Sequence, residues 1–208
     1  MGFGRSAISL QGFATAGANV GLAVLNLAFA WAHVLAYSRQ PRLSVALLVF
    51  LEVLIASLFV ARRDAEKTSY RAAPFLVTVF GIYLPLLLRP VPGALDGVLA
   101  TAFQVGGSIA AVLAAASLNR SFGLLPAYRG VKDSGAYRIV RHPLYASYLL
   151  MHLGYVLNNP SAWNVAVLAA AIPFQLARVV YEEQLLARYP SYRNYRARTR
   201  WRLVPFVF

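Results

Sequence analysis

The residues best suited to chemistry lie in the C-terminal half, and the first cluster runs from Gly135 to Tyr145. It reads GAYRIVRHPLY, with two tyrosines, two arginines, a histidine and a proline. Pro143 suits the first turn of a helix, where its missing N–H costs nothing. The free N–H groups of such a turn attract a carboxylate or phosphate. The cluster therefore indicates either a ligand-binding helix start or a basic anchor for lipid headgroups.

The second cluster is acidic. Arg178 and Glu182 lie four residues apart, so they share one helix face and can pair. Glu182 and Glu183 are adjacent in a strongly basic segment, although the chain has only seven acidic residues. A functional carboxylate here could bind a ligand hydroxyl pair or an amino group. The alternative is an ion pair on a solvated helix.

The third cluster runs from Tyr189 to Arg202. Tyr192, Tyr195 and Thr199 fall on one helical face, with the arginines largely on the others. This pattern predicts a short helix at the membrane interface. Simple membrane docking is the favoured interpretation of its tyrosine face.

The composition places these clusters in a membrane protein. Hydrophobic residues make up 59% of the 208 residues and charged residues 13%, against about 25% charged in soluble domains. The net charge of +13 fits basic ends of membrane helices better than nucleic-acid binding, since no nucleic-acid motif accompanies it. Without cysteine, disulfides and thiolate chemistry are excluded. Three separated histidines argue against a metal site.

The apolar segments predict the fold. A spanning helix needs about 20 mainly apolar residues, and residues 1–17 do not form such a segment, so we expect them to be loose or to lie on the membrane. Asn158-Asn159-Pro160 is a turn signal inside a long apolar region, which predicts a helical hairpin. We predict an all-α integral membrane protein of five to six spanning helices, a C-terminal helical hairpin and a short interfacial helix. The apolar segments are 18–37, 43–61, 73–89, 94–117 and 143–178.

The basic residues predict the orientation. If the N-terminus is cytoplasmic, that side holds all but three of the 20 lysines and arginines, the exceptions being Arg39, Arg42 and Arg89. Segment 118–142 and the tail after Arg178 then flank the hairpin on the cytoplasmic side and must lie close together. We therefore divide the chain into spanning helices over 1–117 and a ligand-binding half over 118–208.

Three polar residues lie inside the predicted spans: His33, Glu52 and Gln104. Ionisable groups in a membrane are costly and are often functional. Hydrogen bonding between helices is the favoured interpretation, and contact of Glu52 or His33 with a substrate is the alternative.

The ordered set of motifs over about residues 115–205 resembles the isoprenylcysteine carboxyl methyltransferase family and the related phospholipid N-methyltransferases. The set is SGAYRIVRHPLY at 134–145, Asn159-Pro160, Arg178 with Glu182-Glu183, and YPSYRNY at 189–195. The resemblance implies S-adenosylmethionine as the cofactor and a lipophilic acceptor that enters from the bilayer. Residues 121–127 resemble a bacterial branch, which implies an inner membrane with the site facing the cytoplasm.

The resemblance also implies residue roles. Arg178 and Glu182 would sit at the reacting end, with Arg141 close to them. The residues expected to hold the cofactor are Gly135, Tyr137, His142, Pro143, Tyr145 and Glu183.

Some alternatives stay open on the sequence. A carboxylate acceptor needs an arginine to orient it, whereas an amine acceptor needs a base such as Glu182. Membrane sterol reductases have a similar C-terminal half, so a reductase that uses NADPH is a second hypothesis. A membrane scaffold without chemistry is a third.

Overall fold

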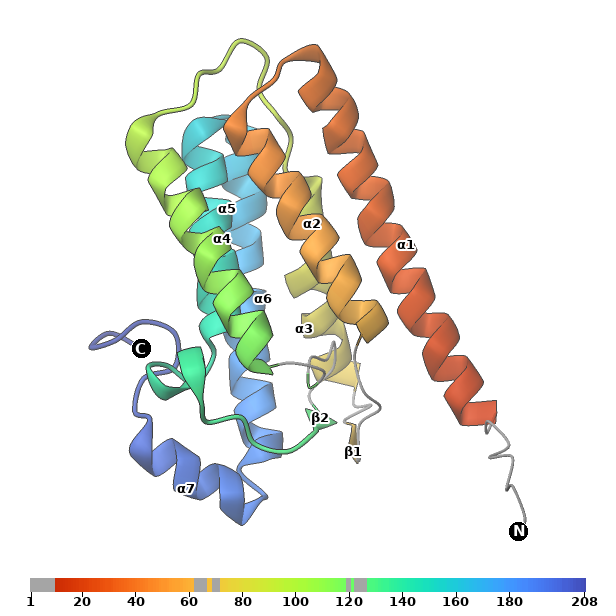
Figure 1. Cartoon of the computed structure of the whole chain (residues 1–208), viewed down its shortest axis with the longest axis vertical. Coiled ribbons are helices and arrows are strands. Elements are labelled where there is room, and N and C mark those ends of the chain that lie inside the picture. The colour runs from red at the N-terminus through yellow and green to blue at the C-terminus, as the bar shows by residue number, and fades with distance from the viewer. Residues whose placement is uncertain (1–9, 62–66, 69–71, 119–120, 122–126) are drawn as a thin grey trace.

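The computed structural model describes residues 10–61, 67–68, 72–118, 121 and 127–208. These residues form a helical bundle (Figure 1). Its helices are α1 (Leu10–Arg39), α2 (Leu43–Ala61), α3 (Ala72–Tyr83), α4 (Val98–Leu118), α5 (Pro143–Asn158), α6 (Ala162–Leu186) and α7 (Pro190–Arg198). The shorter elements are the 3₁₀ turns η1 (Pro85–Leu87) and η3 (Gly135–Arg138) and the strands β1 (Lys67–Thr68) and β2 (Ala127–Tyr128).

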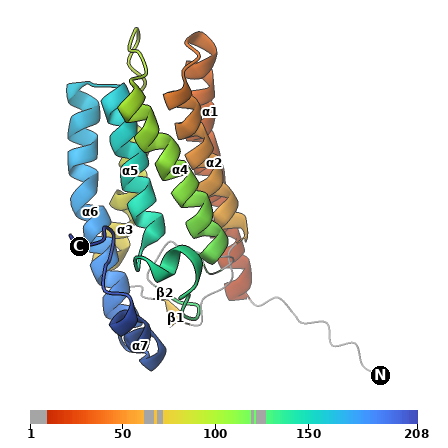
Figure 2. The same ribbon diagram turned by 60° about the vertical axis from the view of Figure 1, so that its left-hand side comes forward.

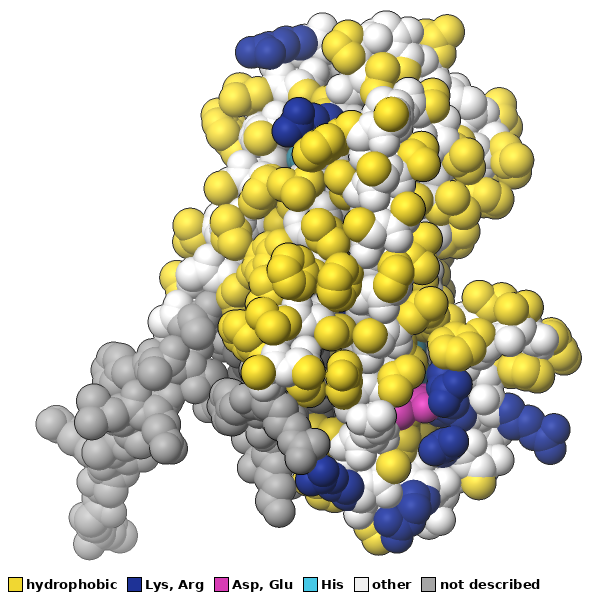
Figure 3. Space-filling model, turned by 180° about the vertical axis from the view of Figure 1, so that it is seen from behind, with side chains coloured by type: hydrophobic (Ala, Val, Ile, Leu, Met, Phe, Trp, Pro, Cys, Tyr) yellow, Lys and Arg dark blue, Asp and Glu magenta, His cyan; other side chains and the backbone are white. Residues whose placement is uncertain are grey.

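The bundle is an integral membrane fold, as predicted. Four helical segments in the described part of the chain are long and apolar enough to span a membrane: Asn19–Arg39, Leu43–Ala61, Val98–Leu118 and Ala162–Leu186. Figure 3 shows hydrophobic side chains over the middle of the molecule, with most of the visible lysines and arginines at one end. That distribution matches a bilayer with one basic face.

Some predicted boundaries were wrong. Helix α1 begins at Leu10, so residues 10–17 are helical and not loose; that they lie on the membrane stays a prediction, and residues 1–9 lie outside the described residues. The predicted span 73–89 is interrupted, because α3 ends at Tyr83 and η1 follows. The predicted hairpin is confirmed: α5 and α6 are joined by the short turn 159–161.

Close packing between α4 and α5 fixes the position of the hairpin. A Cβ atom on Gly154 would lie 2.5 Å from the carbonyl oxygen of Ala100, so only glycine permits this approach. Nearby, Leu51 of α2, Ala111 of α4 and Met151 of α5 belong to one buried hydrophobic cluster. The N-terminal helices and the hairpin therefore share a core.

A buried polar network joins the loops at the opposite end from the basic face. Arg42 Nη2 donates to Asp96 Oδ1 at 2.6 Å, and Arg42 Nη1 donates to Asn159 Oδ1 at 2.8 Å. The Ser44 N–H donates to Asp96 Oδ2 at 2.9 Å. Burial works to raise the pKa of Asp96, but the hydrogen bonds from Ser44 and Arg42 outweigh it and hold that pKa below its ordinary value. The network ties the start of α2 to the turn of the hairpin.

The segments expected to carry chemistry meet at the other end. Figures 1 and 2 place η3, β2, α7 and the end of α6 together, at the end where α1 begins. Strand β1 pairs with β2 in antiparallel register, with Lys67 opposite Tyr128. The predicted proximity of segment 118–142 to the tail is thus observed in the described residues.

Candidate functional site

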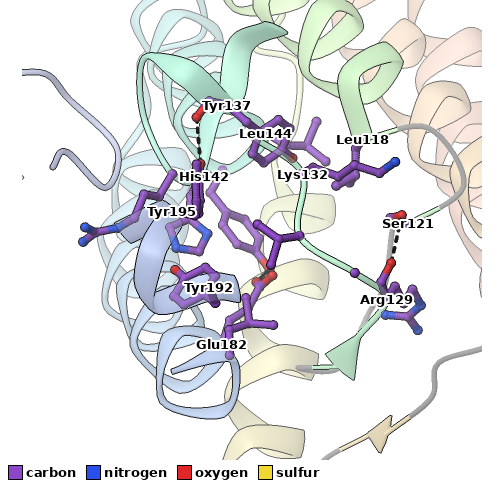
Figure 4. Close-up of a pocket in the computed structure, with 15 residues that line it drawn as sticks. Leu118, Ser121, Arg129, Lys132, Tyr137, His142, Leu144, Glu182, Tyr192 and Tyr195 are labelled. Carbon is purple, nitrogen blue, oxygen red and sulfur yellow. Dashed lines mark hydrogen bonds between the residues drawn. The ribbon is translucent and has the colours of Figure 1, made fainter. Parts of the chain in front are cut away.

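A cavity opens where these segments meet (Figure 4). In the described part of the chain, six segments contribute to it: the end of α4, the loop before η3, η3 itself, the start of α5 with the two residues before it, the end of α6, and α7. The residues that line it are Leu118, Ser121, Arg129, Gly130, Val131, Lys132, Tyr137, Arg141, His142, Leu144, Tyr145, Glu182, Leu186, Tyr192 and Tyr195. These described residues combine aromatic rings, cations and one carboxylate, a set suited to an amphipathic ligand with charged groups.

Gly135 gives η3 its position on α4. Its φ of +58° lies in the left-handed region that favours glycine, and a Cβ atom there would collide with Ser117. The next residue, Ala136, donates its N–H to Ser117 Oγ at 3.4 Å. Gly135 itself does not line the cavity, but the turn that it begins carries Tyr137 into the wall.

The tyrosine face of α7 is part of the cavity wall. Tyr195 donates its hydroxyl hydrogen to the carbonyl oxygen of Tyr137 at 2.7 Å, and the rings of Tyr192 and Tyr195 meet edge to face at 5.7 Å. Burial raises the pKa of both Tyr192 and Tyr195, so both stay protonated at neutral pH. The prediction that this face docks on the membrane was wrong, because it packs inward on Tyr137. The buried Tyr192 hydroxyl has no hydrogen-bond partner among the described residues.

A buried ion cluster supports the cavity from behind. Glu183 accepts hydrogen bonds from Arg141 Nε at 2.7 Å and from Arg202 Nε at 3.0 Å, and His142 Nε2 lies 3.3 Å from it. Glu183 does not line the cavity, whereas Arg141 and His142 do. Its carboxylate therefore fixes two wall residues and contacts the ligand space only through them.

The C-terminal segment is fastened to the start of α5. The N–H groups of Arg141 and His142 donate to the carbonyl oxygens of Trp201 at 2.8 Å and Arg202 at 2.9 Å. Pro143 follows as the first residue of α5, as predicted. Because the N–H of His142 is already paired, an anion at this helix start would have to use groups further along.

Arg178 and Glu182 share a helix face but form no direct ion pair in the described residues. The Tyr145 hydroxyl stands between them: it donates to Glu182 Oε2 at 2.8 Å and accepts from Arg178 Nη2 at 3.3 Å. The Arg178 guanidinium also lies over the Tyr145 ring, 4.7 Å from its centre. Tyr145 and Glu182 line the cavity, whereas Arg178 lies beyond them and lines a second cavity between the helices.

Sequence reasoning missed part of the wall. Tyr192 and Tyr195 line the cavity although their pattern predicts membrane docking, and Arg129 and Lys132 line it although the sequence indicates only their side of the membrane. The Tyr-x-x-Tyr spacing put both tyrosines on one face, but spacing does not tell which surface that face meets.

A family model matches part of the chain. The model of the phospholipid methyltransferase family matches residues 95–193, just under half of the chain. The match spans α4, the hairpin, most of the cavity wall and the start of α7, and it confirms the predicted resemblance. No curated protein and no solved structure matches the chain.

Proposed function

We propose that this chain, which carries the phospholipid methyltransferase match in a membrane-spanning bundle, uses S-adenosylmethionine to methylate a lipophilic acceptor at the cytoplasmic membrane face. The family match by itself indicates a membrane methyltransferase. The observation that supports the more specific proposal is the cavity at the basic end, with its aromatic wall and with Glu182 as the single acid among the described residues that line it.

The described residues fit this cofactor. The rings of Tyr137, Tyr192 and Tyr195 offer apolar and aromatic surface for an adenine. The unpaired Tyr192 hydroxyl is available to a polar atom of the ligand. Lys132 in the wall suits the carboxylate of the cofactor. When bound, S-adenosylmethionine supplies a methyl group already activated by its sulfonium, so positioning supplies much of the catalysis.

Some of the expected cofactor residues contact the ligand directly in this proposal, and the others hold those residues in place. Tyr137, His142 and Tyr145 face the ligand directly. Gly135 and Pro143 set the backbone that carries them, and Glu183 holds His142 and Arg141 in place. Arg141 Nη1 donates hydrogen bonds to the carbonyl oxygens of Thr199 and Arg200, both at 3.1 Å. We therefore assign Arg141 to closing the site with the C-terminal segment.

The reacting end lies at Tyr145 and Glu182. Both residues line the first cavity, and Arg178, one helical turn before Glu182 on α6, donates to the same Tyr145 hydroxyl. A carboxylate acceptor would be oriented by Arg178 and would release no proton. An amine acceptor would lose its proton to Glu182, directly or through the Tyr145 hydroxyl.

Calorimetric titration of the detergent-purified protein with S-adenosylmethionine and with NADPH tests the proposal. We expect S-adenosylmethionine to bind, and His142→Ala to weaken that binding roughly tenfold or more, as loss of a wall contact to a charged ligand does. Arg196→Ala is the control, because Arg196 is exposed on α7 and lies outside the cavity wall. Binding of NADPH in place of S-adenosylmethionine would overturn the proposal, and binding of neither would point to a scaffold.

A further inference from the structure

A second cavity lies between α2, α3, α5 and α6, inside the spanning part of the bundle. It is lined by Leu48, Leu51, Glu52, Ile55, Gly81, Ile82, Pro85, Leu86, Tyr148, His152, Gln175 and Arg178. The aliphatic side chains suit a lipid tail. The lining also holds three ionisable side chains, those of Glu52, His152 and Arg178. Ionisable groups are rare at membrane depth and usually mark a functional path.

Glu52 faces this cavity from α2 as one half of a buried ion pair. Its Oε1 lies 3.1 Å from His33 Nδ1, and both side chains are almost fully buried. The two ring nitrogens of His33 also face backbone carbonyl oxygens, Nδ1 that of Phe29 at 3.0 Å and Nε2 that of Leu88 at 3.1 Å. Only an imidazolium has an N–H on both nitrogens, so this geometry favours His33 charged and Glu52 ionised beside it.

Glu52 is short of hydrogen-bond donors. His33 Nδ1 lies 3.1 Å from Glu52 Oε1 but also faces the Phe29 carbonyl oxygen, and neither carboxylate oxygen of Glu52 accepts a hydrogen bond of good geometry from the described residues. A buried carboxylate without donors is costly. A donor that a ligand brings into the cavity would remove that cost.

Arg178 faces the same cavity from α6, and one of its hydrogen-bond donors is unused. Its Nη1 donates to Gln175 Oε1 at 2.9 Å, while its buried Nε has no partner among the described residues. No carboxylate of the described residues forms a salt bridge with Arg178. A buried cation without an anion is unfavourable, so the cavity also suits an anionic group. Gly81 leaves room for this side chain, since a Cβ atom there would lie 2.7 Å from Arg178 Cδ.

The second cavity adjoins the first through one side chain. Tyr145 lines the first cavity and accepts a hydrogen bond from Arg178, which lines the second. A group held at Arg178 is therefore separated from the proposed methyl donor only by the Tyr145–Glu182 hydrogen bond. This places the second cavity where an acceptor entering from the bilayer would present its head.

We propose that the second cavity binds the head of the acceptor lipid, with Arg178 on its anionic group and the Glu52–His33 pair selecting a head that carries an O–H or N–H donor. The inference rests on the proposed function and narrows the acceptor to a lipid anion with a neighbouring donor. Glu52 is here a specificity-determining residue in a helix outside the family match, which begins at residue 95.

Binding of two probe lipids tests it, hexadecanoate and 2-hydroxyhexadecanoate, which differ only in the donor beside the carboxylate. Affinities come from the rise in Tm of the detergent-purified protein with lipid concentration. We expect wild type to bind the 2-hydroxy lipid roughly tenfold tighter, as one hydrogen bond to a charged group allows. Glu52→Leu should bind both lipids equally, and Arg178→Gln should weaken both.

Charge balance and folding are controlled in the same series. Glu52→Leu alone leaves the buried His33 charge unpaired, which can prevent folding. The double variant His33→Leu/Glu52→Leu removes both charges, so it measures the loss of selectivity without an unpaired charge. Ser108→Ala is a matched control, because Ser108 is buried and polar but lines neither cavity. Equal affinities in wild type, selectivity that persists in the double variant, or no binding of either lipid would each overturn the inference. Affinity for S-adenosylmethionine, measured on the same variants, stays at the wild-type value and reports separately on the proposed function.

Discussion

The Tyr145 hydroxyl donates a 2.8 Å hydrogen bond to Glu182 Oε2 and so joins the start of α5 to the end of α6. The two residues are 37 positions apart, and the hairpin turn at the far end of the bundle brings them together. Tyr145 and Glu182 line the first cavity, while Arg178, which donates to the Tyr145 hydroxyl, lines the second.

Tyr145→Phe tests the importance of this bond. The ring stays, so the contact with the Arg178 guanidinium and the packing are kept, but Glu182 and Arg178 both lose a partner. We expect unchanged affinity for S-adenosylmethionine and turnover lower by roughly 10- to 100-fold, as loss of one hydrogen bond to a charged group implies. Turnover is measured as methyl transfer from labelled cofactor into extracted lipid. Equal turnover in wild type and variant would contradict a role for the hydroxyl.

Glu183→Gln should destabilise the fold and loosen the C-terminal segment. The substitution leaves Arg141 and Arg202 without their shared carboxylate, and breaking a buried ion pair costs about 3–5 kcal/mol. Denaturant titration of the detergent-purified protein measures the loss. Arg198→Gln is the control, because its ion pair with Asp133 is exposed and such pairs contribute little. Similar losses of unfolding free energy in both variants would show that the buried Glu183 cluster stabilises the fold no more than an exposed ion pair does.

Much of the fold could be predicted because the bilayer restricts the choices. Apolar length alone located α2 and α4, and Asn159-Pro160 marked the hairpin turn. Apolar length did not reveal the break after Tyr83, since the residues to Leu88 are as apolar as those before them; Pro85 is the signal in the sequence that could have marked it. The helix gives way to η1 at Pro85, and Leu88 then turns its carbonyl to His33, a contact 55 residues away.

The site was predicted by residue type better than by geometry. The motif residues Tyr137, His142 and Tyr145 do line one cavity. Helical spacing suggested that Arg178 pairs with Glu182, but spacing cannot show that a tyrosine from α5 reaches between them. The inward face of α7 was equally hidden, because an amphipathic helix has the same pattern on a membrane and on a protein surface.

Asp96→Asn should weaken the polar network at the far end in a pH-dependent way. The pKa of Asp96 is held below its ordinary value of 3.8 by Ser44 and Arg42, against the effect of burial. Its contribution to stability is therefore complete above pH 3.8 and is lost as pH falls through the lower folded value. Melts at several pH values should show wild type more stable at pH 7, with the gap to Asp96→Asn closing below pH 3.8. Asp133→Asn is the matched control, and a gap that is constant with pH would contradict the assignment.

Both termini should be cytoplasmic. The described ends lie at the same face of the bundle, the start of α1 with the C-terminal segment (Figure 1), and this face carries most of the basic residues. Fusions of a reporter that fluoresces only in the cytoplasm, placed at Met1 and at Phe208, should both be active. A silent C-terminal fusion with an active periplasmic phosphatase at the same position would remove the cytosolic cofactor from the proposed site.

Arg178→Lys should keep the fold and the cofactor site but lose most turnover. A lysine preserves the positive charge, yet it cannot donate to Gln175 and Tyr145 in the fixed planar geometry of the guanidinium. If that fork orients the acceptor, the lost contact of about 3–4 kcal/mol lowers turnover by roughly 10²–10³. The assay is methyl transfer into extracted lipid, with a melt and an S-adenosylmethionine titration on the same sample. Arg89→Lys is the matched control, because Arg89 is exposed at the opposite end, over the Trp163 ring. Near-normal turnover in Arg178→Lys would show that only the positive charge of this residue matters, and it would contradict a role for the guanidinium in orienting the acceptor.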